Sequence, residues 1–234
     1  MPLSGNWSNG IAARAAVTGR EDDMIGIIDY EAGNITSVAR ALDFLGRPHL
    51  IARDPKELDK ASHLIFPGVG AAGEAMACLK AAGLDHWLQD YLPSGRPLLG
   101  ICLGTQVILA SSEEDETRCL GLIPGRVRRF PDDLSYRGNP LKVPHMGWNQ
   151  VEFTRNHPVF QDLPPGGEFY FVHSYYPVPT DQAWVAGWTG YGLRFCSALA
   201  RANLVAVQFH PEKSGRLGLK LLDNFCRWDG RDAE

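Results

Sequence analysis

The chain has 234 residues, of which 21% are charged, and a formal net charge of −4 at pH 7. This length suffices for one well-buried domain, and the balanced charge without any Lys/Arg-rich stretch argues against nucleic acid as a partner. No apolar run approaches the roughly 20 residues of a membrane span and the five cysteines contain no CxxC pair, so we expect a cytoplasmic protein without metal, cofactor or membrane.

The first 23 residues are predicted to form a flexible extension, and the domain is predicted to occupy residues 24–230. Arg14 interrupts the mildly apolar part of this extension, and three acidic residues end it, a pattern unlike a secretory signal peptide. Because Arg14 and Arg20 precede these acids, a weak organellar transit signal is the alternative.

An alternation of strands and helices begins after the extension. Short apolar runs of the buried-strand type lie at residues 24–30, 63–68 and 97–101. Between them, residues 35–46 show one apolar helical face, with Asn34 as the predicted cap and Gly46 as the stop, and another helix is predicted from Gly73. This order is typical of a parallel sheet with crossover helices.

The pattern changes beyond about Gly121. Strand-like pieces are split there by Gly, Pro and Asn, which predicts antiparallel hairpins added to the parallel core. Ser214 is the predicted cap of a last helix, whose apolar stripe consists of Leu217, Leu221, Leu222, Phe225 and Trp228. Without internal repeats or a linker, the predicted fold is one α/β domain with a mostly parallel central sheet, flanking helices and added antiparallel strands.

The heptapeptide GICLGTQ places Cys102 between a predicted strand and a predicted helix. Gly100 and Gly104 let the neighbouring backbone pass closely, an arrangement typical of a nucleophile elbow. The helix start favours the thiolate, and the Leu103 amide could donate to an oxyanion. A lone cysteine in an apolar context is more often core filler. We assign that role to the other four, Cys78, Cys119, Cys196 and Cys226.

The late segment QFHPEKS supplies what a cysteine nucleophile needs. His210 ends an apolar strand and could serve as the base, and Glu212 could fix its tautomer. A third segment, PGVG at residues 67–70, could aim a second backbone N–H at the oxyanion. By itself this turn would indicate no more than the start of a helix.

GICLGTQ, PGVGAAGEAM and QFHPEKS together resemble the class I glutamine amidotransferases, whose glutaminase domain uses a Cys-His-Glu triad. DYEAGNITSV, GLIPG, KVPHMGWN and YFVHSYY look like the glutaminase subunits of imidazole glycerol phosphate synthases, in histidine biosynthesis. The resemblance runs from about Met24 to Trp228. It implies a glutaminase that forms a heterodimer with a (β/α)8-barrel cyclase, passes ammonia to it, and has lyase activity in that complex.

The resemblance also implies a role for each matching residue. Cys102 is the nucleophile, His210 the general base and then acid, and Glu212 the orienting carboxylate. The oxyanion and substrate-binding residues are Gly68, Val69, Gly70, Leu103, Gln106, Glu114, Ser174 and Tyr175. The residues that face the cyclase are His145, Met146, Trp148, Asn149, Tyr170 and Lys213. The chain departs from the family pattern at Thr105, Glu31 and Ala32, which affects substrate packing rather than the class of chemistry.

Two other interpretations remain. One is a different class I amidotransferase or a γ-glutamyl hydrolase, which KVPHMGWN disfavours. The other is a non-catalytic, amidotransferase-like regulatory module, which an intact triad disfavours because such a module would not need it. The glycine-rich oxyanion turn further predicts weak glutamine hydrolysis in the absence of the cyclase.

Overall fold

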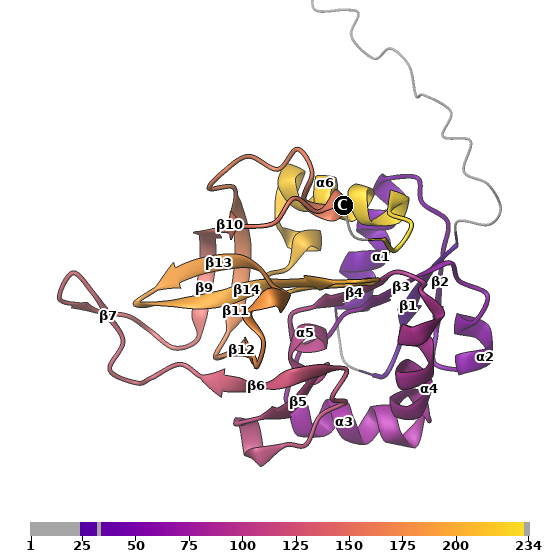
Figure 1. The fold of residues 1–234 in the computed structure, drawn as a ribbon, viewed down its shortest axis with the longest axis horizontal. Helices are drawn as coiled ribbons and strands as arrows, with labels where there is room; N and C mark the ends of the chain where they lie inside the picture. The colour runs from indigo at the N-terminus through magenta and orange to yellow at the C-terminus, as the bar shows by residue number, and fades with distance from the viewer. Residues whose placement is uncertain (1–23, 32–33, 232–234) are drawn as a thin grey trace, which may run out of the picture.

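The computed structural model describes residues 24–31 and 34–231, so the predicted extension and Ala32 lie outside the described residues. An eight-stranded sheet forms the centre of the fold, in the order β10-β13-β14-β15-β4-β3-β1-β2 (Figure 1). Its strands are β1 (Ile25–Ile28), β2 (His49–Ala52), β3 (His63–Phe66), β4 (Leu98–Ile101), β10 (Glu152–Phe153), β13 (Val185–Tyr191), β14 (Leu193–Arg201) and β15 (Leu204–Val207).

Five neighbouring strands of this sheet, from β2 to β15, run parallel, and β14, β13 and β10 extend it as antiparallel strands. The predicted α/β class is therefore confirmed. One assignment was wrong: β15 was expected in the antiparallel part, but it pairs in parallel with β4, with Val207 opposite Ile101. This pairing brings the segment after β15 next to the segment after β4.

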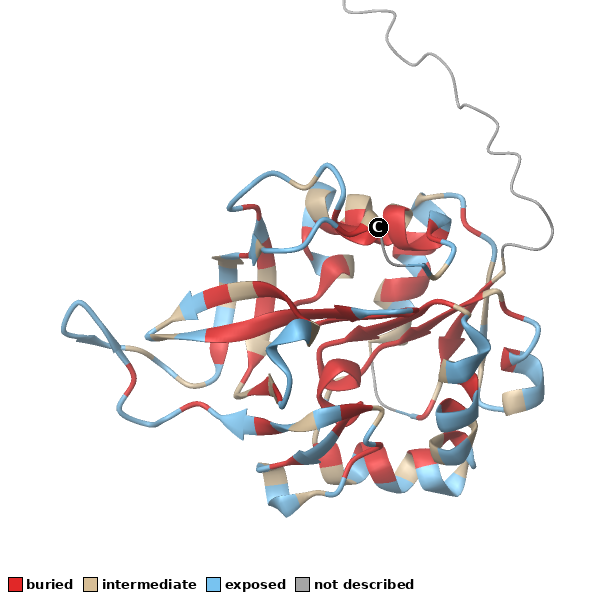
Figure 2. Cartoon of the chain, viewed as in Figure 1, coloured by how far each residue is buried: buried red, intermediate tan, exposed pale blue. Residues whose placement is uncertain are grey.

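Helices cover both faces of the sheet (Figures 1 and 2). The α-helices are α1 (Ile35–Phe44), α2 (Pro55–Leu58), α3 (Ala72–Ala81), α4 (Leu84–Tyr91), α5 (Leu103–Val107) and α6 (Gly215–Arg227). Residues of α1 and α6 belong to one buried apolar cluster, and residues of α3, α4 and α5 belong to the other. The inner strands β1, β3, β4 and β15 are fully buried because apolar side chains pack on both faces (Figure 2).

Three smaller sheets lie beside the central one. They are formed by β9 (His145–Gln150) with β11 (Glu168–His173), by β5 (Leu109–Ser112), β6 (Ile123–Arg129) and β12 (Tyr175–Pro179), and by β7 (Ser135–Tyr136) with β8 (Asn139–Pro140). The expected antiparallel pairing holds for β9 with β11 and for β6 with β12, whereas β5 and β6 run parallel. Short 3-10 helices connect these elements at Leu92–Ser94, Glu114–Glu116, Pro158–Phe160, Gln182–Trp184 and Pro211–Lys213.

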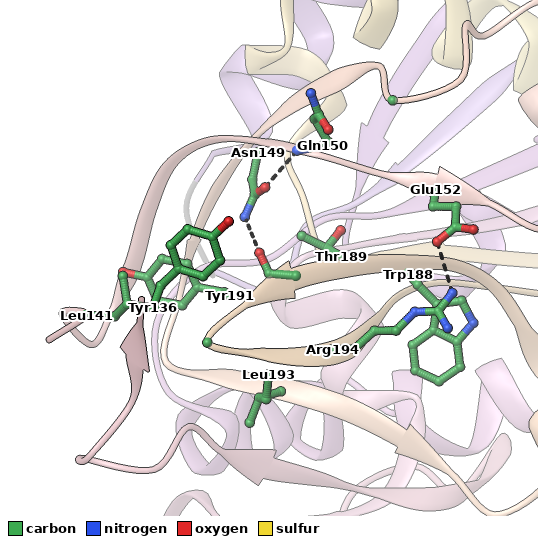
Figure 3. A pocket seen from close by; sticks show the side chains of 13 residues that line it. Tyr136, Leu141, Asn149, Gln150, Glu152, Trp188, Thr189, Tyr191, Leu193 and Arg194 are labelled. Carbon is green, nitrogen blue, oxygen red and sulfur yellow. Dashed lines mark hydrogen bonds and ion pairs between the residues drawn. The ribbon is translucent and has the colours of Figure 1, made fainter. Parts of the chain in front are cut away.

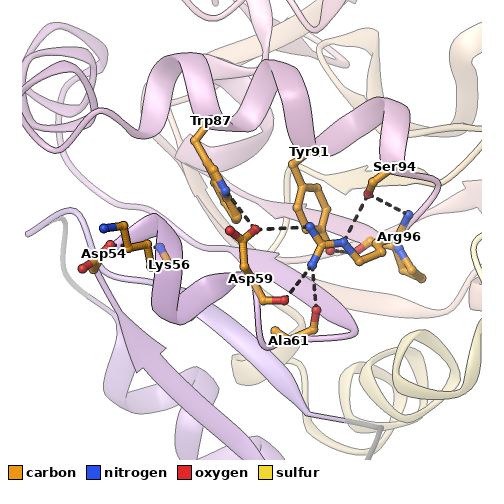
Figure 4. A network of polar contacts seen from close by, with 9 residues as sticks. Asp54, Lys56, Asp59, Ala61, Trp87, Tyr91, Ser94 and Arg96 are labelled. Carbon is orange, nitrogen blue, oxygen red and sulfur yellow. Dashed lines mark hydrogen bonds and ion pairs between the residues drawn. The ribbon is translucent and has the colours of Figure 1, made fainter.

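A network around Arg96 holds the chain just before β4 (Figure 4). Its guanidinium donates to the main-chain oxygens of Asp59 and Ala61, each at 3.1 Å, and lies 4.4 Å from the centre of the Tyr91 ring. Trp87 donates to the Asp59 carboxylate at 3.1 Å. The network thus ties α4 and the turn after α2 to the start of the strand that leads to Cys102.

Asn34 and Ser214 occupy the N-cap positions of α1 and α6, as predicted, but neither side chain makes a cap hydrogen bond. Ser214 instead donates to the His210 carbonyl at 2.6 Å and accepts from the Tyr170 amide at 2.9 Å. The side chain therefore bonds to residues of other elements, although its local sequence context indicated a capping role. Within the described residues, no helix has the length and apolar character that crossing a membrane requires.

Candidate active site

Cys102 lies at the junction between β4 and α5, in the sharp turn that the sequence predicts. Its backbone has φ 54° and ψ −107°, a conformation that costs a non-glycine residue about 1–3 kcal/mol. The main-chain N–H of Cys102 donates to the Val207 carbonyl at 2.9 Å, and the Cys102 carbonyl accepts from the main-chain N–H of Gln106 at 3.2 Å. These bonds hold the strained residue in place at the carboxyl end of the strand.

Two glycines allow the backbone segments to meet at this turn. A Cβ on Gly104 would lie 1.9 Å from the Phe66 carbonyl oxygen, and a Cβ on Gly68 would lie 2.0 Å from the Tyr30 hydroxyl. The contact at Gly104 is with backbone and excludes any side chain there, whereas a side chain at Gly68 would require that Tyr30 move. Close packing of the end of β3, the 67–70 turn and α5 therefore positions Cys102.

His210 and Glu212 follow β15 and reach the same edge of the sheet as Cys102. His210 Nδ1 lies 2.7 Å from Glu212 Oε1, and both side chains are fully buried. His210 Nε2 has no hydrogen-bond partner within the described residues, and Cys102 acts on the imidazole by raising its pKa. The structure therefore brings the three predicted triad residues together in the order cysteine, histidine, glutamate.

Asn34 adds a contact to this group that the sequence analysis missed. Its Nδ2 donates to Glu212 Oε1 and lies 3.4 Å from His210 Nδ1. Asn34 is the residue just before α1, with φ 82°, so a strained backbone again accompanies a functional position. The amide fixes the carboxylate that in turn orients the imidazole.

The charges around His210 determine its protonation. Burial lowers the pKa of the imidazole, but the adjacent Cys102 thiolate and Glu212 carboxylate outweigh burial and raise it from 6.5 to about 10. A histidine with a pKa raised in this way carries its proton at neutral pH. His210 is thus set up to deliver a proton to a leaving group.

A pocket of about 280 Å³ opens next to Cys102. Seven of the eight residues predicted to bind the substrate or its oxyanion line it: Val69, Gly70, Leu103, Gln106, Glu114, Ser174 and Tyr175. Val172 and His173 also line it, and the sequence analysis did not single them out. Glu114 Oε2 accepts from the Ala72 amide at 2.7 Å, and burial is the main reason that its pKa is raised.

The eighth residue, Gly68, is absent from the pocket lining. Its carbonyl accepts the Leu103 N–H at 3.3 Å, and Leu103 is the residue whose amide was expected to hold the oxyanion. In this conformation the expected donor is therefore engaged within the chain. Gly70 has φ +101°, a conformation that glycine adopts at little cost.

The family model "Glutamine amidotransferase class-I" matches residues 26–228. The chain belongs to the class I glutamine amidotransferase family. This amidotransferase is 54% identical over 206 residues to "Imidazole glycerol phosphate synthase subunit HisH" of Maridesulfovibrio salexigens, which covers 88% of this chain and 97% of the relative. It is 48% identical over 209 residues to the HisH subunit of Pseudomonas syringae, with 88% and 98% covered.

Solved structures agree with the fold of this amidotransferase. A GMP synthase subunit from Thermoplasma acidophilum superimposes with a TM-score of 0.66 at 22% identity, covering 87% of this chain and 92% of that chain. PurLQS from Thermotoga maritima gives a TM-score of 0.67 at 16% identity, covering 87% and 97%. The family assignment makes the chain an enzyme, and the HisH relatives are each named as a subunit of a synthase.

The residues predicted to face a partner fall on two faces of β9. Met146 and Trp148 are 62% and 55% exposed, and Tyr170 of β11 lies beside Trp148 with an edge-to-face ring contact of 6.1 Å. His145 and Asn149 point to the opposite face, because side chains alternate along a strand. His145 is buried on that face, and its predicted role toward a partner stays a prediction.

Lys213 follows His210 and Glu212 in the amidotransferase sequence and is exposed. Asn149 is half-buried, and its side chain donates to the Gly190 carbonyl at 3.0 Å. Its role as a partner contact, like that of Met146, Trp148 and Tyr170, stays a prediction. Asn149 also lines a larger cavity of about 870 Å³, away from Cys102 (Figure 3).

Acid is expected to destabilise this amidotransferase through two buried histidines. Burial lowers the pKa of His145 from 6.5 to about 4 and that of His173 from 6.5 to about 3. Between these pKa values and about 6.5, the unfolded chain binds more protons than the folded chain. The free energy of unfolding should therefore fall as the pH drops, by about 1 kcal/mol per pH unit for each histidine. Urea unfolding at several pH values from 7 to 5 measures this slope.

The variant His145→Asn should reduce the slope, whereas changing the exposed His86 to Asn should leave it unchanged. His210 adds little to the slope in this range. Its raised pKa stabilises the folded state fully below pH 6.5, and this stabilisation is lost only as the pH rises above 6.5. An unfolding free energy that does not fall between pH 6.5 and pH 5 would contradict the expectation.

Proposed function

We propose that the chain is the glutaminase subunit of imidazole glycerol phosphate synthase, which hydrolyses glutamine and passes ammonia to a cyclase for histidine biosynthesis. The single observation that carries the chemistry is the buried Cys102, His210 and Glu212 group beside a pocket of about 280 Å³. The HisH relatives, matched over nearly their whole length, support this member of the family over other amidotransferases and over a γ-glutamyl hydrolase.

Acylation begins with the Cys102 thiolate, which attacks the side-chain amide carbon of glutamine. The tetrahedral intermediate collapses to a thioester, and the C–N bond breaks as His210 gives its Nε2 proton to the leaving ammonia. The raised pKa of His210 supports this order, because the imidazolium is present at neutral pH. Glu212, held by Asn34, keeps the ring oriented.

Deacylation regenerates the nucleophile. The now neutral His210 takes a proton from water, the resulting hydroxide attacks the thioester carbon, and the C–S bond breaks to release glutamate and the thiolate. Glu114 lines the pocket, and its proposed role is to bind the α-ammonium group of the substrate. Its bond to the Ala72 amide holds the carboxylate there.

The oxyanion donor suggests why a partner is needed. The Leu103 N–H donates to the Gly68 carbonyl. It can therefore donate to an oxyanion only after the 67–70 turn changes conformation. Removing one oxyanion donor typically costs about 10²–10³ in rate. Weak activity of the isolated chain follows, and binding of the cyclase is proposed to favour the rearranged turn.

Ammonia must not escape into water, where it becomes ammonium, so the cyclase is expected to cover the active-site side of the small β9–β11 sheet. The exposed Met146 and Trp148 give this surface apolar anchors, and Lys213 lies next to the triad segment. Aromatic residues of this kind dominate the energy of many interfaces. A (β/α)8-barrel cyclase is the proposed partner.

The test is glutamate release from glutamine, measured with and without a histidine-pathway cyclase and the nucleotide ligand of that cyclase. We expect slow release by the isolated chain and much faster release in the complex. Trp148→Ala should weaken cyclase binding by about tenfold or more, without changing alkylation of Cys102. The variant Ile51→Ala, exposed on β2 at the far edge of the sheet, is the matched control.

Full turnover by the isolated chain would contradict the need for a partner. Absence of hydrolysis beside any active cyclase would instead favour the non-catalytic regulatory module.

A further inference from the structure

The main-chain carbonyl of Tyr175 lies at the centre of a run of hydrogen bonds that passes through the pocket wall. It accepts from His173 Nδ1 at 2.7 Å and from Gln106 Nε2 at 3.1 Å. A carbonyl oxygen has no proton to give, so both of these atoms must be donors. This one oxygen therefore fixes the tautomer of His173 and the orientation of the Gln106 amide.

Toward the nucleophile, the order of donors and acceptors continues through two buried amides. Gln106 Nε2 also donates to Gln208 Oε1 at 3.2 Å. Since the oxygen of Gln208 faces Gln106, its nitrogen faces the other way and donates to Cys102 Sγ at 3.8 Å. Gln208 is fully buried, and its N–H points at the sulfur, where it would stabilise negative charge. The Cys102 thiol itself donates to the Val172 carbonyl at 3.9 Å.

Away from the nucleophile, the same order continues through two histidines. With its proton on Nδ1, neutral His173 accepts at Nε2, which lies 2.9 Å from His145 Nδ1. His145 consequently carries its own proton on Nδ1, and its Nε2 accepts from Asn149 Nδ2 at 3.1 Å. Asn149 gives its second N–H to the Gly190 carbonyl, in the wall of the larger cavity (Figure 3).

The histidine half of the chain is neutral and rigid. Burial keeps the pKa of both His145 and His173 well below 7, so neither ring is charged at neutral pH. The His145 ring is stacked on Phe171 at 4.8 Å and on Tyr191 at 4.0 Å between ring centres. A buried network in which every member has a partner holds its geometry, because each lost bond leaves an unsatisfied polar group.

We propose that this hydrogen-bond chain, from Asn149 through His145, His173, Tyr175, Gln106 and Gln208 to Cys102, positions the nucleophile. Gln208 touches the reacting sulfur and is a catalytic residue that stabilises the thiolate. His145 and His173 are positioning residues that fix the Tyr175 carbonyl and so the two amides. The inference rests on the proposed function, in which Cys102 is the nucleophile.

The proton order can be observed directly. Side-chain ¹⁵N spectra of the full-length protein at pH 7 should show both His145 and His173 as neutral Nδ1–H tautomers, with signals assigned from single His→Asn variants. An Nε2–H tautomer or a protonated ring at either position would overturn the order of donors and acceptors.

Alkylation of Cys102 by iodoacetamide, followed on the Cys102 peptide by mass spectrometry, tests the effect on the nucleophile without glutamine. Gln208→Met removes the donor and should slow alkylation by about fivefold or more, the equivalent of one lost buried hydrogen bond. Ser197→Ala removes a buried hydroxyl that accepts from Thr189 on the neighbouring strand, outside the chain, and should leave the rate unchanged.

Two variants of one residue separate positioning from packing. In His145→Asn the amide nitrogen takes the place of Nδ1 and can still donate to His173, whereas in His145→Gln the amide lies at the Nε2 position and cannot. We expect near wild-type alkylation for the Asn variant and about fivefold slower alkylation for the Gln variant. Equal rates for the two folded variants would overturn the role of His145, and an unchanged rate in Gln208→Met would overturn the whole proposal.

Should His145→Gln fail to fold, Gln208→Met and the tautomer spectra still decide the matter. The same proteins are then assayed for glutamate release with the cyclase present. If the variants show the expected alkylation rates but none of the proteins releases glutamate, the hydrogen-bond chain is established and the proposed function is refuted. Glutamate release that needs Cys102, together with alkylation unaffected by Gln208→Met, would support the proposed function and refute the role of the hydrogen-bond chain.

Discussion

Replacement of Cys102 by alanine is expected to lower the rate of glutamine hydrolysis in the cyclase complex by at least about 10⁴. Without the sulfur no thioester can form, and neither His210 nor Glu212 offers another nucleophile in the same place. Alanine at φ 54° is no more strained than cysteine, so the elbow should keep its shape. Glutamate release measures the loss, and urea unfolding checks that the variant is folded.

Cys78→Ala is the matched control, because Cys78 is a half-buried cysteine on α3 and is absent from the lining of the Cys102 pocket. It should retain wild-type hydrolysis. Acid quenching of the wild-type enzyme during turnover should in addition trap a glutamyl adduct on the Cys102 peptide. Residual hydrolysis of more than about 1% in Cys102→Ala would indicate another nucleophile and contradict the triad.

The variant Gly104→Ala should lose about 3 kcal/mol or more of unfolding free energy. The new Cβ would lie 1.9 Å from the carbonyl oxygen and 2.9 Å from the carbonyl carbon of Phe66. Both are backbone atoms at the end of β3, so relief requires that α5 move away from the sheet. Because Cys102 immediately precedes α5, its alkylation rate should change together with stability.

Gly190→Ala provides the comparison for this substitution. A Cβ at Gly190 meets nothing within 4 Å, so the free energy of unfolding should stay within about 0.5 kcal/mol of wild type. Urea unfolding of both variants decides the matter. A Gly104→Ala variant as stable as Gly190→Ala would show that the close approach of α5 to β3 does not hold the elbow.

The short motifs contained most of the local information about the site. The glycines around Cys102 predict a strand-to-helix elbow, and the structure has that turn, with Cys102 at φ 54°. His210 and Glu212, two residues apart after an apolar strand, indicate a base with its carboxylate, and they lie 2.7 Å apart. Such pairings depend on neighbours in the chain, which is why the sequence predicts them.

The faces of β9 show where local pattern was insufficient. The sequence groups His145 with Met146 and Trp148 as residues that face a partner, but in the structure His145 lies on the buried face of the strand and the other two are exposed. Strand alternation separates neighbours, yet the register that decides which face is buried comes from the pairing of β9 with β11. That pairing joins segments about 25 residues apart and cannot be deduced from the motif.

By itself the sequence determined the α/β alternation, the elbow at Cys102 and the candidate acid and base, because these features follow from residue type and spacing over a few positions. Tertiary structure alone decided that β15 lies beside β4, which brings His210 to Cys102. It also decided that Asn34 serves Glu212 rather than a helix end, and that Gln208 points to the sulfur. The physical reason is that hydrogen-bond partners far apart in the chain are selected by packing, which local preferences do not specify.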